Sequence, residues 1–92
     1  MNAPVDLQQI ELARLSCLAE REAQALVELS DERDTVTTIE NGWVNMVFTG
    51  RGSKQIGLSL PDSYSIVTRI NYLADTLKRL TQIKNYILEC AA

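Results

Sequence analysis

Apolar residues recur at helical spacing through the first third of the chain. From Leu7 to Leu29, steps of about 100° per residue collect them on one broad side. That side consists of Leu12, Leu15, Leu18, Ala19, Ala23, Ala25, Leu26 and Leu29. The pattern predicts an amphipathic helix over residues 7–29, with Asp6 as its N-cap and alanines that let another element approach closely. Glu22 falls inside the apolar side, and we expect its stem to cover apolar surface while its carboxylate reaches water.

The period changes from helical to alternating after a polar loop at residues 30–34. Residues 35–40 are rich in Thr, Val and Ile, which favour strands. The pair Asn41-Gly42 follows and is a strong hairpin signal. Residues 43–49 form the predicted return strand, and residues 55–60 alternate between apolar and small or polar side chains. The pattern predicts a three-stranded antiparallel meander over residues 35–40, 43–49 and 55–60.

The register of the predicted strands follows from the turn and from the apolar face. A two-residue turn gives the pairs Ile39–Val44, Thr37–Met46 and Thr35–Phe48. For the third strand to add its apolar residues to the same face, Phe48 must lie opposite Ile56. This needs a five-residue loop over residues 50–54, because a one-residue slip turns every side chain to the other face.

The last segment carries a second helical pattern after Pro61. Its stripe consists of Ile66, Ile70, Leu73, Leu77, Leu80 and Ile87, with Lys84 in one slot. We predict a helix over residues 62–89, capped by Asp62 or Ser63. Such a helix is about twice as long as the strands, so it either overhangs the sheet or breaks near residue 81. The same stripe could instead form a dimer seam, although a monomer is favoured.

These elements predict one α+β domain over residues 1–92, with the order α-β-β-β-α. The meander has one strongly apolar face, and both helices need an apolar surface, so we expect both helices on that face. Aromatic residues are only 5 % of the chain, and the core is therefore expected to be aliphatic.

The residue types argue against catalysis and against a bound cofactor. The chain has no histidine, which is the commonest general base and a usual zinc ligand. It also has no Ser-His-Asp or Cys-His set, and its carboxylate pairs lack a pocket-forming context. We therefore expect no enzymatic activity, no metal, no cofactor and no small-molecule substrate.

The cysteines and the hydropathy indicate the compartment. Cys17 and Cys90 are far apart in sequence and form no metal-ligand pair. The sequence shows no export signal and no apolar run of about 18 residues. We expect free thiols in a reducing cytoplasm and no membrane partner, with a disulfide joining the two ends as the alternative.

The net charge of −3 is unevenly distributed along the chain. Residues 1–40 hold nine acidic and three basic side chains, whereas residues 41–92 hold three acidic and six basic ones. Such polarity predicts two differently charged surfaces, which either serve solubility or dock on a mixed-charge partner. The acidic run at residues 28–34 is either a solvated loop or a mimic of nucleic-acid phosphates. The overall charge argues against simple duplex binding.

The predicted hairpins hold the candidate binding residues. The segment Gly50-Arg51-Gly52-Ser53-Lys54 has the wrong spacing and context for a nucleotide-binding loop, so we interpret it as a turn with a basic tip. Arg51 and Lys54 would there engage phosphates or acidic side chains. Trp43, beside Val47 on the open face, either anchors a partner or folds over the sheet edge. Asn41 and Asn45 would add hydrogen bonds.

The whole arrangement resembles a family of phage inhibitors. It combines a first helix, an Asn-Gly-Trp hairpin, a Gly-Arg-Gly turn and a long last helix, without a catalytic set. In these features the chain resembles the small phage-encoded anti-CRISPR proteins, in particular inhibitors of the type I-F system. The resemblance implies a stoichiometric inhibitor in the cytoplasm of the infected bacterium. It would bind Cas subunits of the RNA-guided surveillance complex, with the guide RNA as a further contact, and block target-DNA hybridisation.

Two other functions compete with this expectation. The first is a homodimeric transcriptional or antitoxin-like regulator that uses the last helix as its dimer seam. The second is a structural or assembly protein of a phage particle, which would form larger oligomers.

Overall fold

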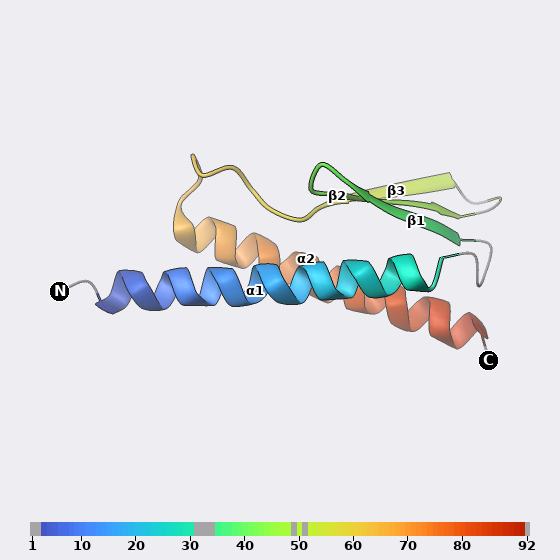
Figure 1. The fold of residues 1–92 in the computed structure, drawn as a ribbon, viewed down its shortest axis with the longest axis horizontal. Coiled ribbons are helices and arrows are strands. Elements are labelled where there is room, and N and C mark those ends of the chain that lie inside the picture. Colours follow the sequence, from blue (N-terminus) through green and yellow to red (C-terminus); the bar gives the residue numbers. More distant parts are fainter. Residues whose placement is uncertain (1–2, 31–34, 49, 51, 92) are drawn as a thin grey trace.

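The computed structural model describes residues 3–30, 35–48, 50 and 52–91. Its elements are α1 (Ala3–Glu28), β1 (Thr35–Glu40), β2 (Trp43–Phe48), β3 (Gly52–Gly57) and α2 (Ile66–Ala91). The strands form one antiparallel sheet in the order β1-β2-β3. The two helices lie side by side beneath one face of this sheet and run in the same direction (Figure 1). The predicted α+β class and the order α-β-β-β-α are confirmed.

The first hairpin has the predicted register. Thr35 pairs with Phe48, Thr37 with Met46 and Ile39 with Val44. Asn41 and Gly42 both have positive φ angles, 52° and 79°, as a two-residue turn with the right-handed twist requires. Asparagine and glycine tolerate this backbone better than other residues, which is why two adjacent residues determine the pairing of two whole strands.

The third strand lies earlier in the sequence than predicted. It covers Gly52–Gly57 instead of residues 55–60, and Phe48 pairs with Gly52, not with Ile56. Three residues therefore connect β2 to β3, and the predicted five-residue loop is wrong. The partner of Phe48 differs by four positions, an even number, so Ile56 still reaches the apolar face, opposite Val44. The predicted end of β2 at residue 49 lies outside the described residues.

The helix boundaries also differ from the prediction. α1 already begins at Ala3, so Asp6 lies inside the helix and is not its N-cap. α2 begins at Ile66, because Ser65 is the cap: its Oγ accepts the backbone N–H of Thr68 at 3.2 Å. α2 continues without a break to Ala91, so the suggested break near residue 81 is wrong.

The core fills the space between the sheet and the two helices. Its buried members are Leu12, Leu15, Ala19, Ala23, Leu26, Val44, Met46, Ile56, Leu73, Leu80 and Ile87. Ala19 and Ala23 are fully buried, which fits their expected role in close helix packing. The molecule measures 53 × 24 × 16 Å, because helices of 26 residues extend well past strands of six.

The apolar stripe of α2 is used within the monomer. Leu73, Leu80 and Ile87 are buried in the core, and Ile70 and Leu77 pack against it. A dimer seam along this stripe would have to take these side chains out of the fold that they stabilise. The structure thus offers no exposed seam at this stripe.

The two charged residues that interrupt the apolar stripes meet each other. The Lys84 ammonium lies 2.9 Å from Oε1 and 2.8 Å from Oε2 of Glu22, across the contact between the helices. The side chain of Glu22 is 22 % exposed and its Oε2 is buried, so the carboxylate turns to Lys84 and reaches water less than expected. The pairing of Glu22 with Lys84 could not be predicted from the sequence, because the two residues lie 62 positions apart.

Candidate docking face on the sheet

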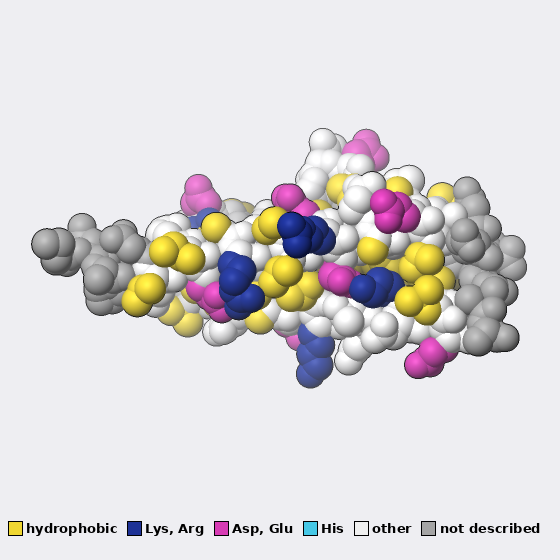
Figure 2. All heavy atoms as spheres, turned by 60° about the horizontal axis from the view of Figure 1, so that its bottom comes forward, with side chains coloured by type: hydrophobic (Ala, Val, Ile, Leu, Met, Phe, Trp, Pro, Cys, Tyr) yellow, Lys and Arg dark blue, Asp and Glu magenta, His cyan; other side chains and the backbone are white. Residues whose placement is uncertain are grey.

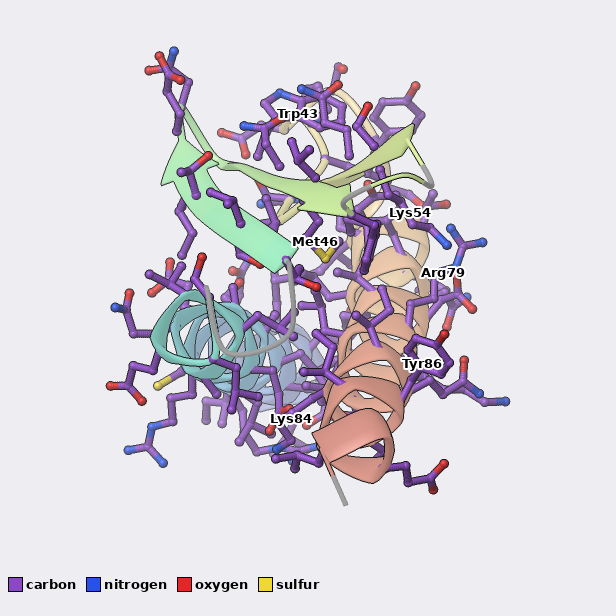
Figure 3. The ribbon with its side chains drawn as sticks, turned by 90° about the vertical axis from the view of Figure 1, so that its right-hand side faces the viewer. Trp43, Met46, Lys54, Arg79, Lys84 and Tyr86 are labelled. Carbon is purple, nitrogen blue, oxygen red and sulfur yellow. The ribbon has the colours of Figure 1, made fainter. Side chains whose placement is uncertain are left out.

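The sheet face opposite the helices is not covered by any described element. Because side chains alternate along each strand, the register places nine residues on this side. We call them the outer face: Val36, Thr38, Glu40, Trp43, Asn45, Val47, Ser53, Gln55 and Gly57. Figure 3 shows Trp43 above the sheet, on the side opposite Met46 and the helices.

Trp43 lies over its cross-strand partner Gly57. A Cβ added to Gly57 would come within 3.4 Å of Cζ3 of the indole ring. The same Cβ would lie 2.9 Å from the Tyr72 hydroxyl, which donates a hydrogen bond to the Gly57 carbonyl oxygen at 3.1 Å. The glycine thus leaves room for the ring to cover the sheet, and the ring still remains 46 % exposed. Trp43 therefore folds over the sheet, as one of the two expectations had it, and also stays accessible.

Two valines form a second apolar spot on the outer face. Val36 and Val47 are direct cross-strand partners, and they are 47 % and 51 % exposed. Between this pair and the indole ring, Gln55 Nε2 donates a hydrogen bond to Asn45 Oδ1 at 2.6 Å. The outer face therefore alternates apolar spots with a fixed amide pair, a composition that suits a protein interface.

A depression of about 410 Å³ lies beside the amide pair. Its lining residues are Asn45, Met46, Val47, Ser53, Lys54 and Gln55. A side chain from a partner could enter this space and contact both apolar atoms and amide groups.

Three of the six predicted binding residues lie together on the outer face, namely Trp43, Asn45 and Val47. Asn41 lies in the turn at the end of the first hairpin and is exposed. Lys54 was expected at a hairpin tip, but it lies within β3, opposite Met46, on the helix-facing side of the sheet. The difference arises because β3 begins at Gly52. Arg51 lies outside the described residues.

Sequence reasoning missed three residues that support the site: Gln55, Gly57 and Tyr72. Gln55 pairs with Asn45 and Gly57 with Trp43 only in the observed register of β3. The sequence signal for Gly57 was a glycine inside a strand pattern, which is typical of a close approach by another group.

A second concave site lies between β3 and α2. It is a cleft of about 330 Å³ lined by Phe48, Lys54, Gln82, Ile83 and Tyr86. Figure 3 shows Lys54, Arg79 and Tyr86 on this same side of the molecule. The helix side carries interspersed basic, acidic and apolar side chains, without one region of a single type (Figure 2).

Among the described residues, no cluster of three or more His, Cys, Asp or Glu side chains has metal-site geometry. Cys17 is an exposed free thiol, and the side chain of Cys90 lies outside the described part of the chain. On the exposed side of α1, hydrogen bonds from Arg14 hold the pKa of the Glu11 carboxyl below its ordinary value of 4.5. The acidic run is described only at its start, since residues 31–34 lie outside the described part.

Neither of the described helices has an apolar stretch sufficient to cross a membrane. Comparisons with known proteins give no match: no protein-family model, no curated protein and no solved structure is significantly similar to this chain.

Proposed function

We propose that this protein is a non-enzymatic, stoichiometric inhibitor that docks through its outer face on a type I-F CRISPR surveillance complex. The bound protein would block target-DNA hybridisation by occupying Cas subunits, in the cytoplasm of an infected bacterium. The partner is the one that the resemblance to anti-CRISPR proteins implies, and the docking surface is the sheet face that no described element covers.

The observation that carries the proposal is the uncovered outer face with its exposed apolar side chains. Trp43, Val36 and Val47 each keep about half of their surface accessible on one side of one sheet. Tryptophan is enriched among the interface residues that dominate affinity, and the Trp43 ring already lies over Gly57 of the sheet. A ring that already lies on the sheet loses less conformational freedom on binding than a side chain without contacts, which favours affinity.

The experiment measures binding of the purified chain to a purified type I-F complex, and then hybridisation of labelled target DNA to that complex. We expect the complex to retain the chain and to lose target binding in proportion to the amount of chain added. A complex that does not retain the chain would overturn the proposed partner.

Two variants test the outer face separately from the partner. Val47→Glu places a charge on the central strand of the outer face, beside Val36, and should weaken binding at least about tenfold. Val67→Glu is the matched control, because Val67 is also 51 % exposed but lies on α2. If both variants bind as well as the unmodified chain, the outer face is not the docking surface.

A further inference from the structure

The hydrogen-bond ladder determines which backbone groups of β3 point away from the sheet. In a two-residue hairpin, Glu40 and Trp43 form a hydrogen-bonded pair, so successive residues of β2 bond alternately to β1 and to β3. The pairs bonded between β2 and β3 are then Val44–Ile56, Met46–Lys54 and Phe48–Gly52. The backbone N–H and C=O groups of Ser53 and Gln55 therefore point outward from the β3 edge.

Side-chain contacts at both edges agree with this assignment. Gly57 follows Gln55 by two positions, and its outward carbonyl accepts the Tyr72 hydroxyl at 3.1 Å. At the β1 edge, the outward N–H of Thr37 donates to Ser30 Oγ at 2.8 Å. Among the described residues, no such partner meets the backbone groups of Ser53 and Gln55. The β3 edge thus has a short unpaired stretch that ends at the Tyr72 cap.

The side chains beside this stretch give it a chemical preference. The Lys54 side chain lies between Ser53 and Gln55 on the helix-facing side and lines the cleft with Phe48 and Ile83. The cleft volume is near the lower end of the range for small-ligand sites, about 300–1,000 Å³, so it suits one or two apolar side chains. The stretch therefore offers backbone hydrogen bonds, a positive charge and an apolar space within one strand length.

We propose that the β3 edge binds an extended segment of a partner protein as a fourth strand. Its backbone would pair with Ser53 and Gln55, a carboxylate would lie opposite Lys54, and a neighbouring apolar side chain would enter the cleft. Strand addition of this kind takes affinity from main-chain bonds and specificity from alternate side chains. The inference goes beyond the proposed function, because it concerns the backbone groups of the β3 edge instead of the outer-face side chains and does not depend on the type I-F complex.

A second copy of this chain is disfavoured as the occupant. Two β3 edges that pair antiparallel through both Ser53 and Gln55 place the Lys54 side chains of the two copies opposite each other. Like charges directly opposite in a sheet are destabilising. A segment with Glu or Asp at that position has the opposite, favourable pairing.

The test uses a synthetic peptide, Thr-Val-Thr-Glu-Thr-Val-Thr with blocked ends, titrated into the full chain and followed by NMR of the backbone amides. Its Glu can lie opposite Lys54, with the Val residues on the same side. We expect the amide signals of Ser53 and Gln55 to shift and to gain protection from solvent exchange. The amide of Thr37, on the opposite edge, should not move. A peptide with Lys in place of Glu should bind at least about tenfold more weakly.

Variants separate the backbone and charge contributions. Gln55→Pro removes the outward N–H but no bond to β2, and should abolish peptide binding. Gln55→Ala is its matched control, because it also loses the Asn45 contact but keeps the N–H, and should bind within about twofold of the unmodified chain. Lys54→Glu keeps the strand and should reverse the preference between the Glu and Lys peptides.

Three results would overturn the proposal. The first is no shift at Ser53 and Gln55 with about 1 mM peptide. The second is equal binding of the Glu and Lys peptides. The third is sedimentation of the chain as a dimer that Gln55→Pro converts to a monomer, which would assign the edge to a second copy.

Discussion

Strands β1 and β3 are both edge strands of one sheet, but they are covered to different degrees. At β1, the Ser30 hydroxyl accepts the Thr37 N–H at 2.8 Å and donates to the Thr35 carbonyl at 3.3 Å. At β3, Tyr72 caps Gly57, and no described residue caps the outward backbone groups of Ser53 and Gln55. A single hydroxyl thus caps two backbone groups at the start of the β1 edge, and edge strands that lack such contacts are open to pairing with another chain.

The two edges also differ in how closely they pack against the helix beneath them. On the β1 side, Thr35 and Thr37 are buried above the core that α1 forms. On the β3 side, Lys54 is exposed and a cleft separates it from Ile83 of α2. We therefore expect the β1 side to carry more of the stability and the β3 side to carry binding, and the following predictions test this division.

The largest expected effect is on the free energy of unfolding, and it is tested by truncating one apolar residue on each side. Leu26→Ala removes a fully buried side chain of α1 and should lower the free energy of unfolding by about 3 kcal/mol. Ile83→Ala truncates a partly buried side chain at the cleft and should cost about 1 kcal/mol. Urea denaturation of both variants measures the difference. Equal losses would contradict the division between the two sides.

Removing the β1 cap should have the next largest effect. Ser30→Ala deletes both hydrogen bonds of the hydroxyl and should cost about 1.5 kcal/mol. The Thr37 amide should also exchange faster with solvent than in the unmodified chain. Ser53→Ala, an outer-face serine on the other edge, is the control and should change stability by less than about 0.5 kcal/mol. Unchanged exchange at Thr37 would show that Ser30 does not protect this edge.

Removing the β3 cap tests the other edge. Tyr72→Phe deletes the hydroxyl that bonds the Gly57 carbonyl and should cost about 1 kcal/mol. Tyr64→Phe is the control, because Tyr64 is half exposed, and it should change stability by less than about 0.5 kcal/mol. Thermal or urea denaturation measures the stability of both variants. Equal stabilities would show that the Tyr72 hydroxyl does not stabilise this edge.

The smallest expected effect is a gain of stability. The Oγ1 of Thr37 is buried and has no hydrogen-bond partner among the described residues. Thr37→Val replaces this hydroxyl by a methyl group of similar shape and should raise the free energy of unfolding by about 0.5–1 kcal/mol. Thr38→Val, the exposed neighbour on the outer face, should change it little. A loss of stability in Thr37→Val would indicate that the hydroxyl has a partner.

The part of the candidate site that lies on β2 could be predicted from the sequence, but the part that lies on β3 could not. Trp43, Asn45 and Val47 share a face because they alternate along one strand, and alternation is a local property. Lys54 was misplaced because its position depends on the start of β3. The sequence between residues 49 and 55 contains two glycines and fits turns of more than one length.

The sequence by itself determined the element order, the first hairpin and the face to which each strand turns its apolar residues. These features depend on neighbouring residues, such as the turn at Asn41 and Gly42, or on a period of two or 3.6. The tertiary structure decided the register of β3, because a shift by an even number of residues leaves every side chain on its face. It also decided the contacts Ser30–Thr37, Tyr72–Gly57 and Glu22–Lys84, since each joins segments whose proximity exists only after the helices pack beneath the sheet.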